Sequence, residues 1–191
     1  GNDKELSKDI DLLISQTKRC SEILKQISKK QIEEDIFLSS IKFEDLLEEI
    51  INSFKETSSK KIDLSIDKDR NKIAIQRTPE IIYGLRNFIG NAVKFSKSKV
   101  KINLASDQNF IEIKINDDGP GIPEDVIKKI GEPYIKSKSE AVSSNSGLGL
   151  GTFLGKTLLE RQNAKLLFKK NSGIGGALVI ITWNPKSFFN S

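Results

Sequence analysis

The sequence contains no histidine and no methionine, and it has a single cysteine among its 191 residues. Chemistry that needs an imidazole therefore cannot come from this chain alone. The lone Cys20 excludes an intramolecular disulfide and fits a reducing compartment. No apolar run approaches the roughly 18 residues of a membrane-spanning helix, and there is no signal peptide. These absences predict a cytoplasmic location.

The composition is that of a soluble globular protein, with 37% hydrophobic and 30% charged residues, enough for one domain or one and a half. The net charge is +5, but the lysines are mingled with acids and no aromatic platform accompanies them, so we expect no nucleic-acid partner. The chain opens with Gly1-Asn2, without methionine, and we expect an excised fragment. Any membrane attachment of the parent protein would then lie in removed segments.

A first motif lies on a predicted helix over residues 79–96, where apolar residues recur every three or four positions. Thr78 is a candidate N-cap, followed by proline at the first helical position. Gly84, Asn87, Asn91 and Lys94 share a second face that carries no acid. An amide oxygen can bind Mg²⁺ and a lysine can attract phosphate. The alternative interpretation is an ordinary solvated polar face.

A second motif follows a predicted strand over residues 110–116, in which apolar and polar side chains alternate. Asp117, Gly119 and Gly121 come directly after that strand. The glycines let the backbone approach a flat ligand closely. A carboxylate here can accept a hydrogen bond from the amino group of adenine, whereas the carbonyl of guanine would be repelled. Taken alone, the motif could equally be a simple turn.

A third motif, a glycine-rich run over residues 147–152, opens a predicted helix. Backbone N–H groups at such a helix start can bind an anion. The run is not a Walker A loop, because it lacks the closing Gly-Lys-Ser/Thr, and it does not follow a strand as a dinucleotide-binding loop does. The polar segment 128–146 before it suits a lid over a ligand.

In order and spacing, the three motifs resemble the N, G1 and G2 boxes of the histidine-kinase-like ATPase (Bergerat, GHKL) superfamily, over roughly residues 40–185. The resemblance implies ATP and Mg²⁺ as cofactors. It implies Asn91 as the Mg²⁺ ligand and Asp117 as the adenine-reading carboxylate, with Asn87 and Lys94 near the metal and the phosphates. The remaining implied nucleotide-binding residues are Gly119, Gly121, Gly147, Gly149, Gly151 and Thr152.

Within the superfamily, the residues favour a sensor histidine kinase. ATPase branches place a glutamate four residues before the metal asparagine as a general base, and here Asn87 cannot take a proton. Tyr134 stands where sensor kinases carry the phenylalanine of their F box, and Phe95 where a tyrosine or histidine is common. We therefore expect Asn87, Lys94 and Tyr134 to serve phosphoryl transfer to a protein.

The start of the chain supports this assignment. Apolar positions from Leu6 to Ile27 step alternately by four and three residues, a heptad pattern that needs partner helices. Residues 15–24 are similar to the second helix of the dimerisation hairpin in the RegB/PrrB group of redox-responsive sensor kinases. That resemblance implies a homodimer formed through a helical bundle, and a response regulator as partner. Because the acceptor histidine belongs to the first helix of the hairpin, it is missing here.

Cys20 lies on the heptad seam, and two interpretations of it are open. It can be a small buried hydrophobe. It can also be a redox switch, because Lys18 and Arg19 would favour its thiolate and the RegB group uses a cysteine in this helix. On the second hypothesis, oxidation would link two chains through Cys20.

The sequence thus predicts an α/β fold of Bergerat type, a two-layer sandwich of a mixed sheet with helices on one face, preceded by a long bundle helix. The proposed boundaries are 1–34 for a partial dimerisation helix and 35–191 for a catalytic ATP-binding domain. A helix is expected at 43–57, and strands at 62–66, 72–76, 99–105, 110–116, 165–169 and 177–183, the last two as a hairpin. The alternative functions are an ATPase of this superfamily or a non-catalytic nucleotide-binding module.

Overall fold

The computed structural model describes residues 14–19, 40–67, 73–107, 109–122, 127, 130, 150–170 and 175–185. The chain divides into two units, Gly1–Ser39 and Ser40–Ser191. In the first unit, the described segment 14–19 is helical. The rest of the predicted heptad, with Cys20, lies outside the described residues, so the boundary proposed at residue 34 stays a prediction.

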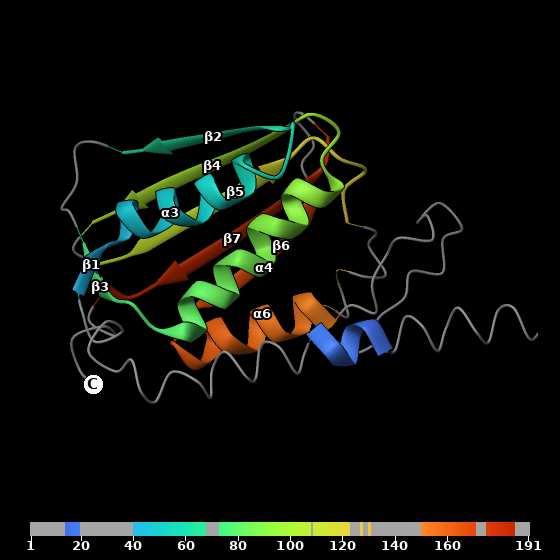
Figure 1. Cartoon of the computed structure of the whole chain (residues 1–191). Helices are drawn as coiled ribbons and strands as arrows, with labels where there is room; N and C mark the ends of the chain where they lie inside the picture. Colours follow the sequence, from blue (N-terminus) through green and yellow to red (C-terminus); the bar gives the residue numbers. More distant parts are fainter. Residues whose placement is uncertain are drawn as a thin grey trace, which may run out of the picture. The chain divides into compact units, whose positions relative to one another are not determined.

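The second unit is built on a mixed five-stranded sheet in the order β2-β4-β5-β7-β6 (Figure 1). The strands are β2 (Lys61–Ile66), β4 (Lys99–Ser106), β5 (Ile111–Asp117), β6 (Lys165–Lys170) and β7 (Ala177–Trp183). β2 runs parallel to β4, and the other neighbouring pairs are antiparallel. The predicted mixed sheet and the hairpin formed by β6 and β7 are thus confirmed.

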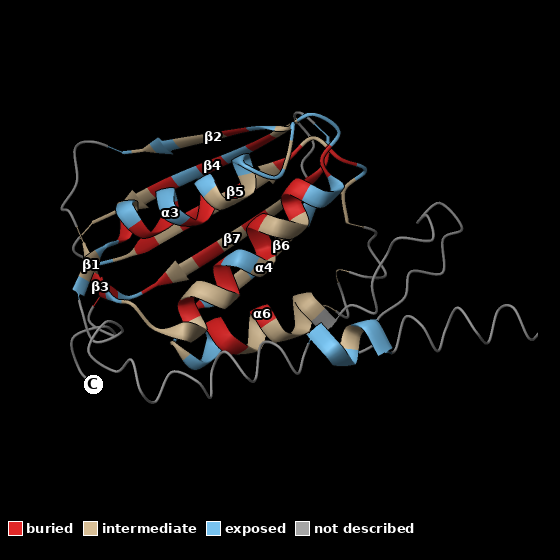
Figure 2. Cartoon of the chain, in the orientation of Figure 1, coloured by how far each residue is buried: buried red, intermediate tan, exposed pale blue. Residues whose placement is uncertain are grey.

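Three helices cover one face of this sheet: α3 (Phe43–Lys55), α4 (Pro79–Phe95) and α6 (Leu150–Arg161) (Figure 1). The strands show why, since alternate residues of β5 such as Ile113 and Ile115 are buried beneath the helices while Lys114 faces the other side. Figure 2 shows the matching buried stripes on α3 and α4. In the described part of the chain, no helix is both long and apolar enough to cross a bilayer.

A separate two-stranded ribbon joins β1 (Ser40–Lys42) to β3 (Ala74–Gln76), with Ile41 opposite Ile75. β3 is the strand expected at 72–76, shorter at its start, and it pairs outside the main sheet. β1 was not predicted from the sequence. Three residues with one partly buried side chain, Ile41, give no periodicity to detect.

The N-terminus of α4 is capped as its sequence predicts. Thr78 has extended backbone geometry, and its Oγ1 accepts a hydrogen bond from the N–H of Ile81 at 3.3 Å. Pro79 occupies the first turn, where its missing N–H costs nothing. At the other end the helix stops at Phe95, one residue earlier than predicted. α4 is therefore fixed at the start of the segment that carries Asn87, Asn91 and Lys94.

Candidate nucleotide site

Asp117 is the last residue of β5, and it is buried, with 5% of its surface exposed. Its Oδ1 accepts hydrogen bonds from the backbone N–H of Gly119 at 2.8 Å and of Ala177 at 3.2 Å. Both hydrogen bonds that the described residues donate to this carboxylate are accepted by the same oxygen. Oδ2 is therefore the atom that can accept a hydrogen bond from a ligand.

The electrostatic surroundings of Asp117 suit a hydrogen-bond donor. Burial raises the pKa of its carboxyl above the ordinary value, and the charge of Asp118 acts in the same direction. The N–H groups of Gly119 and Ala177 and the ammonium of Lys60 oppose this rise. A buried carboxylate is costly unless its oxygens are hydrogen-bonded, so an amino group placed at Oδ2 would be favourable.

Glycines bring three backbone segments together around Asp117. A Cβ on Gly119 would lie 2.3 Å from the carbonyl oxygen of Phe95, and one on Gly176 would lie 1.9 Å from that of Asp117. Gly121 and Gly176 also have positive φ, at +84° and +83°. Only glycine allows these approaches. Gly176 precedes β7 in the β6–β7 hairpin, and its contact with Asp117 was not predicted from the sequence.

The second part of the site lies where α4 meets α6. The Nδ2 of Asn91 donates to the Oγ1 of Thr152 at 3.2 Å. The Nδ2 of Asn87 donates to the carbonyl of Tyr83 at 2.8 Å, and a Cβ on Gly151 would come within 3.1 Å of the Oδ1 of Asn87. The polar face of α4 thus meets α6 at Asn87 and Asn91, and the interpretation of it as a merely solvated face is wrong.

Lys94 and Phe95 end this helix close to the Asp117 turn. Both are exposed, Phe95 to 42%, and the Nζ of Lys94 lies 5.3 Å from the centre of the Phe95 ring. Since the Phe95 carbonyl abuts Gly119, the end of α4 and the turn after β5 form one continuous region. The region offers a carboxylate at one side and amides with a cation at the other.

The carboxylate, the amides and the lysine fit a nucleotide whose phosphates and Asn91 bind the same divalent cation. The described residues contain no group of three or more His, Cys, Asp or Glu side chains that could hold a metal ion by themselves. Asn91 can offer its Oδ1, because its Nδ2 is engaged with Thr152. Mg²⁺ is commonly held by few protein oxygens together with phosphates and water, so a cation at Asn91 would need further oxygens from the ligand.

Several predicted site residues lie outside the described residues: Gly147, Gly149, Tyr134, Cys20 and the proposed lid at 128–146 apart from Ile130. Their assigned roles stay predictions. Of the predicted set, the structure brings together Asn87, Asn91, Gly151 and Thr152 in one group. It brings Asp117, Gly119 and Gly121 together in the other.

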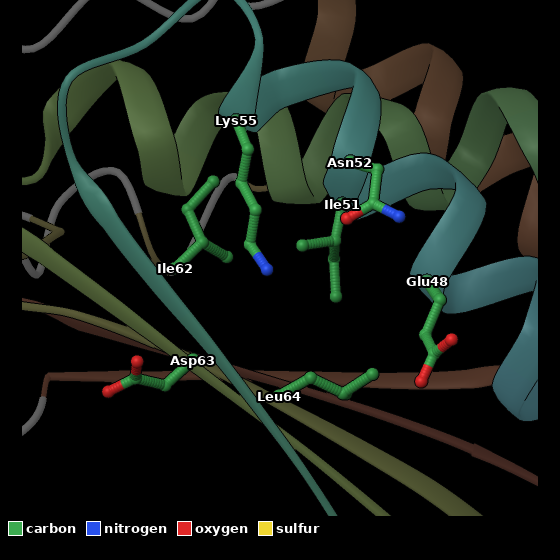
Figure 3. Close-up of a pocket in the computed structure, with 7 residues that line it drawn as sticks. All are labelled: Glu48, Ile51, Asn52, Lys55, Ile62, Asp63 and Leu64. Atoms are coloured by element: carbon green, nitrogen blue, oxygen red, sulfur yellow. The ribbon is translucent and has the colours of Figure 1, made fainter.

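A cavity of about 470 Å³ lies elsewhere, between α3 and β2 (Figure 3). Its lining residues are Glu48, Ile51, Asn52, Lys55, Ile62, Asp63 and Leu64. The acids Glu48 and Asp63 would repel phosphates, and the lining has no glycine through which backbone could approach a ligand. This cavity is not the nucleotide site.

The sequence profile described as "Histidine kinase-, DNA gyrase B-, and HSP90-like ATPase" matches residues 78–186, more than half of the chain. The chain belongs to this family. The matching segment contains α4, the turn after β5, α6 and the β6–β7 hairpin. The hydrogen bonds of Asp117 and Asn91 described above therefore all lie within it.

Relatives of this ATPase-family chain include the sensor histidine kinase RegB of Cereibacter sphaeroides, which is 34% identical over 171 residues. That alignment covers 85% of this chain and 37% of RegB, so the chain spans well under half the length of this relative. The chain is homologous to sensor histidine kinases.

Two solved structures share the fold. The mycobacterial sensor histidine kinase MprB has a TM-score of 0.63 at 17% identity, covering 77% of this chain and 97% of that one. Full-length ShkA in complex with AMPPNP has a TM-score of 0.63 at 22% identity, covering 78% and 31%. The predicted Bergerat-type fold is thereby confirmed.

Proposed function

We propose that this chain binds Mg-ATP and is the catalytic part of a sensor histidine kinase, which transfers the γ-phosphoryl group to a histidine on a segment absent from this sequence. The observation that carries the proposal is Asp117, a buried carboxylate with one oxygen held by two backbone N–H groups and the other without a hydrogen bond from the described residues. Homology to sensor histidine kinases supports the reaction class, and the ShkA complex with AMPPNP supports the ligand.

The two parts of the site would bind different parts of the nucleotide. Asp117 would accept a hydrogen bond from the adenine amino group, with Gly119 and Gly121 against the base. Asn91 would hold Mg²⁺, which neutralises phosphate charge, and Lys94 would add a point charge. Phosphoryl transfer depends mainly on such positioning and neutralisation.

Asn87 supports transfer to a protein over hydrolysis. Its Nδ2 donates to the Tyr83 carbonyl on its own helix, and its side chain has no basic atom. A general base for water must accept a proton near neutral pH. Asn87 cannot do this, so ATP would stay intact until the acceptor imidazole arrives.

In the intact protein we propose a homodimer formed through a helical bundle, with Tyr134 near that bundle and a response regulator receiving the phosphoryl group. The same proposal assigns the chain to the cytoplasmic part of a membrane-attached sensor. The redox hypothesis for Cys20 rests on the resemblance of residues 15–24 to the RegB/PrrB group. If mild oxidant leaves only monomers on non-reducing gels, with the Cys20→Ser variant as control, that hypothesis is wrong.

The test begins with calorimetry of Mg-ATP and Mg-ADP binding to this chain. A bundle fragment that carries the acceptor histidine is then added, and transfer of label from γ-labelled ATP is followed. Binding together with a labelled fragment supports the kinase. Steady-state hydrolysis without a labelled fragment would favour the ATPase alternative. Tight binding with neither hydrolysis nor labelling would favour the non-catalytic nucleotide-binding module. Absence of nucleotide binding would refute the proposed site.

A further inference from the structure

The turn that connects α4 to β4, residues 96–98, is held together with the first residue of β4 by charged side chains on two sides. Lys60 precedes β2 and approaches the turn from one side of β4, because Lys61 is paired with Lys99 in the parallel ladder. Asp118 follows β5 and approaches from the other side, because Val100 is paired with Asp117 in the antiparallel ladder. β4 lies between these two strands.

On its side, Lys60 binds the carbonyls at the end of α4. Its Nζ donates to the Ser96 carbonyl oxygen and, at 3.4 Å, to that of Lys94. The last carbonyls of a helix have no partner within the helix, and a lysine side chain can satisfy them. The neighbouring N–H of Lys61 donates to the Ser98 carbonyl at 2.9 Å, which ties the same turn to β2.

On the other side, the Asp118 carboxylate accepts hydrogen bonds from several N–H groups of this segment. It accepts from the backbone of Lys97 at 2.8 Å and of Ser98 and Lys99 at 3.1 Å. The Ser98 hydroxyl donates to it at 2.6 Å. This hydroxyl, followed by the backbone donors, holds the pKa of Asp118 well below its usual range, so this carboxylate is charged at neutral pH.

We propose that Lys60 and Asp118 are positioning residues that fix the end of α4, and with it Asn91 and Lys94, against the turn that follows Asp117. The inference rests on the proposed nucleotide site. The clamp acts where the Phe95 carbonyl abuts Gly119, so that the end of α4 adjoins the turn after β5. Neither residue need touch the nucleotide.

The expected signature is a loss of affinity for ligands that span both parts of the site. Lys60→Gln removes a charged donor but keeps a long polar side chain, and we expect roughly tenfold weaker binding of Mg-ATP. Adenosine, which reaches only the Asp117 part, should bind with an affinity within about twofold of the wild type. Lys60→Arg should restore most of the Mg-ATP affinity, because the guanidinium can donate to both carbonyls.

Two matched controls separate the clamp from general charge effects. Lys61→Gln makes the same change at the next residue, whose described ion pair is an exposed contact to Asp63 at 3.7 Å. Asp63→Asn matches Asp118→Asn in the same way, since Asp63 forms ion pairs only with the partly exposed side chains of Lys61 and Lys99 among the described residues. We expect both controls to bind Mg-ATP like the wild type, while Asp118→Asn weakens binding as Lys60→Gln does.

The affinities for Mg-ATP and adenosine are measured by calorimetry, and the stability of each variant is measured by urea unfolding. Wild-type Mg-ATP affinity in both Lys60→Gln and Asp118→Asn would overturn the clamp while leaving the nucleotide site intact. Equal losses for adenosine and Mg-ATP would also overturn it, because they indicate that the change acts on the Asp117 part itself or on the whole fold. If the wild type itself bound no nucleotide, the proposed function and the clamp would both be wrong.

Discussion

Asn91 donates its side-chain hydrogen bond to the hydroxyl of Thr152, 61 residues further along the chain, at 3.2 Å. The bond joins the helix of the first motif to the helix that the third motif opens. It also sets the orientation of the Asn91 amide, because the nitrogen is engaged with α6. The oxygen is the atom that remains for a cation.

The Thr152→Val substitution should weaken Mg²⁺-dependent nucleotide binding. Valine keeps the shape of threonine but cannot accept the hydrogen bond, so the Asn91 amide loses its fixed orientation. We expect a roughly tenfold loss of Mg-ATP affinity and a smaller loss for ATP without Mg²⁺, measured by calorimetry. Thr152→Ser keeps the hydroxyl and should bind Mg-ATP like the wild type. If the ATP affinity of Thr152→Val depended on Mg²⁺ as much as that of the wild type, the role given to this hydrogen bond would be wrong.

Asp117→Asn should stabilise the unliganded fold while abolishing tight ATP binding. The asparagine oxygen can still accept from Gly119 and Ala177, but the buried charge disappears. Because the folded-state pKa of Asp117 is raised, its ionisation lowers stability as the pH rises from about 4 through the folded-state pKa. At pH 7 the variant should therefore have a higher Tm than the wild type. A lower Tm, or unchanged ATP affinity, would contradict the role of the carboxylate.

The Asp118→Asn variant should differ most from the wild type above about pH 4. The pKa of Asp118 is lowered in the folded state, so its ionisation contributes stability above the unfolded-state pKa, and this contribution is lost as the pH falls through the folded-state value. Urea midpoints measured from pH 7 to pH 2 should converge for the two proteins. A gap that stays constant with pH would show that the carboxylate charge is not involved.

The crossing of α4 over α6 depends on Gly84. A Cβ at this position would lie 2.4 Å from the Cγ of the buried Leu159, so Gly84→Ala should force the helices apart and cost about 1–3 kcal/mol. Leu159→Ala alone should cost about 2–5 kcal/mol. In the double variant the clash is removed, and the total loss should be smaller than the sum. Additive losses in urea unfolding would contradict this contact.

The sequence was sufficient for the elements whose side chains repeat regularly. The helix at 79–95, its Thr78 cap and the alternation that leads to Asp117 are all local patterns. The N–H of Ala177 and the ammonium of Lys60 escaped detection, because their proximity to Asp117 and to the end of α4 follows from which strands are neighbours. No local pattern carries that information. A lysine before a strand and an alanine after two glycines are ordinary in isolation.

The position of Asp117 on β5 has a consequence for how this site can change during evolution. β5 is the central strand of five, and its register is fixed on both sides, by β4 and by β7. A slip of one residue would turn the carboxylate to the opposite face of the sheet, so the adenine recognition proposed for Asp117 depends on the register of the whole sheet. The Asn91–Thr152 contact is made between two helices, which can shift against each other by small steps without exchanging partners. We therefore expect homologous sequences to keep the recognition of adenine and to differ in how tightly they hold the phosphates of the nucleotide.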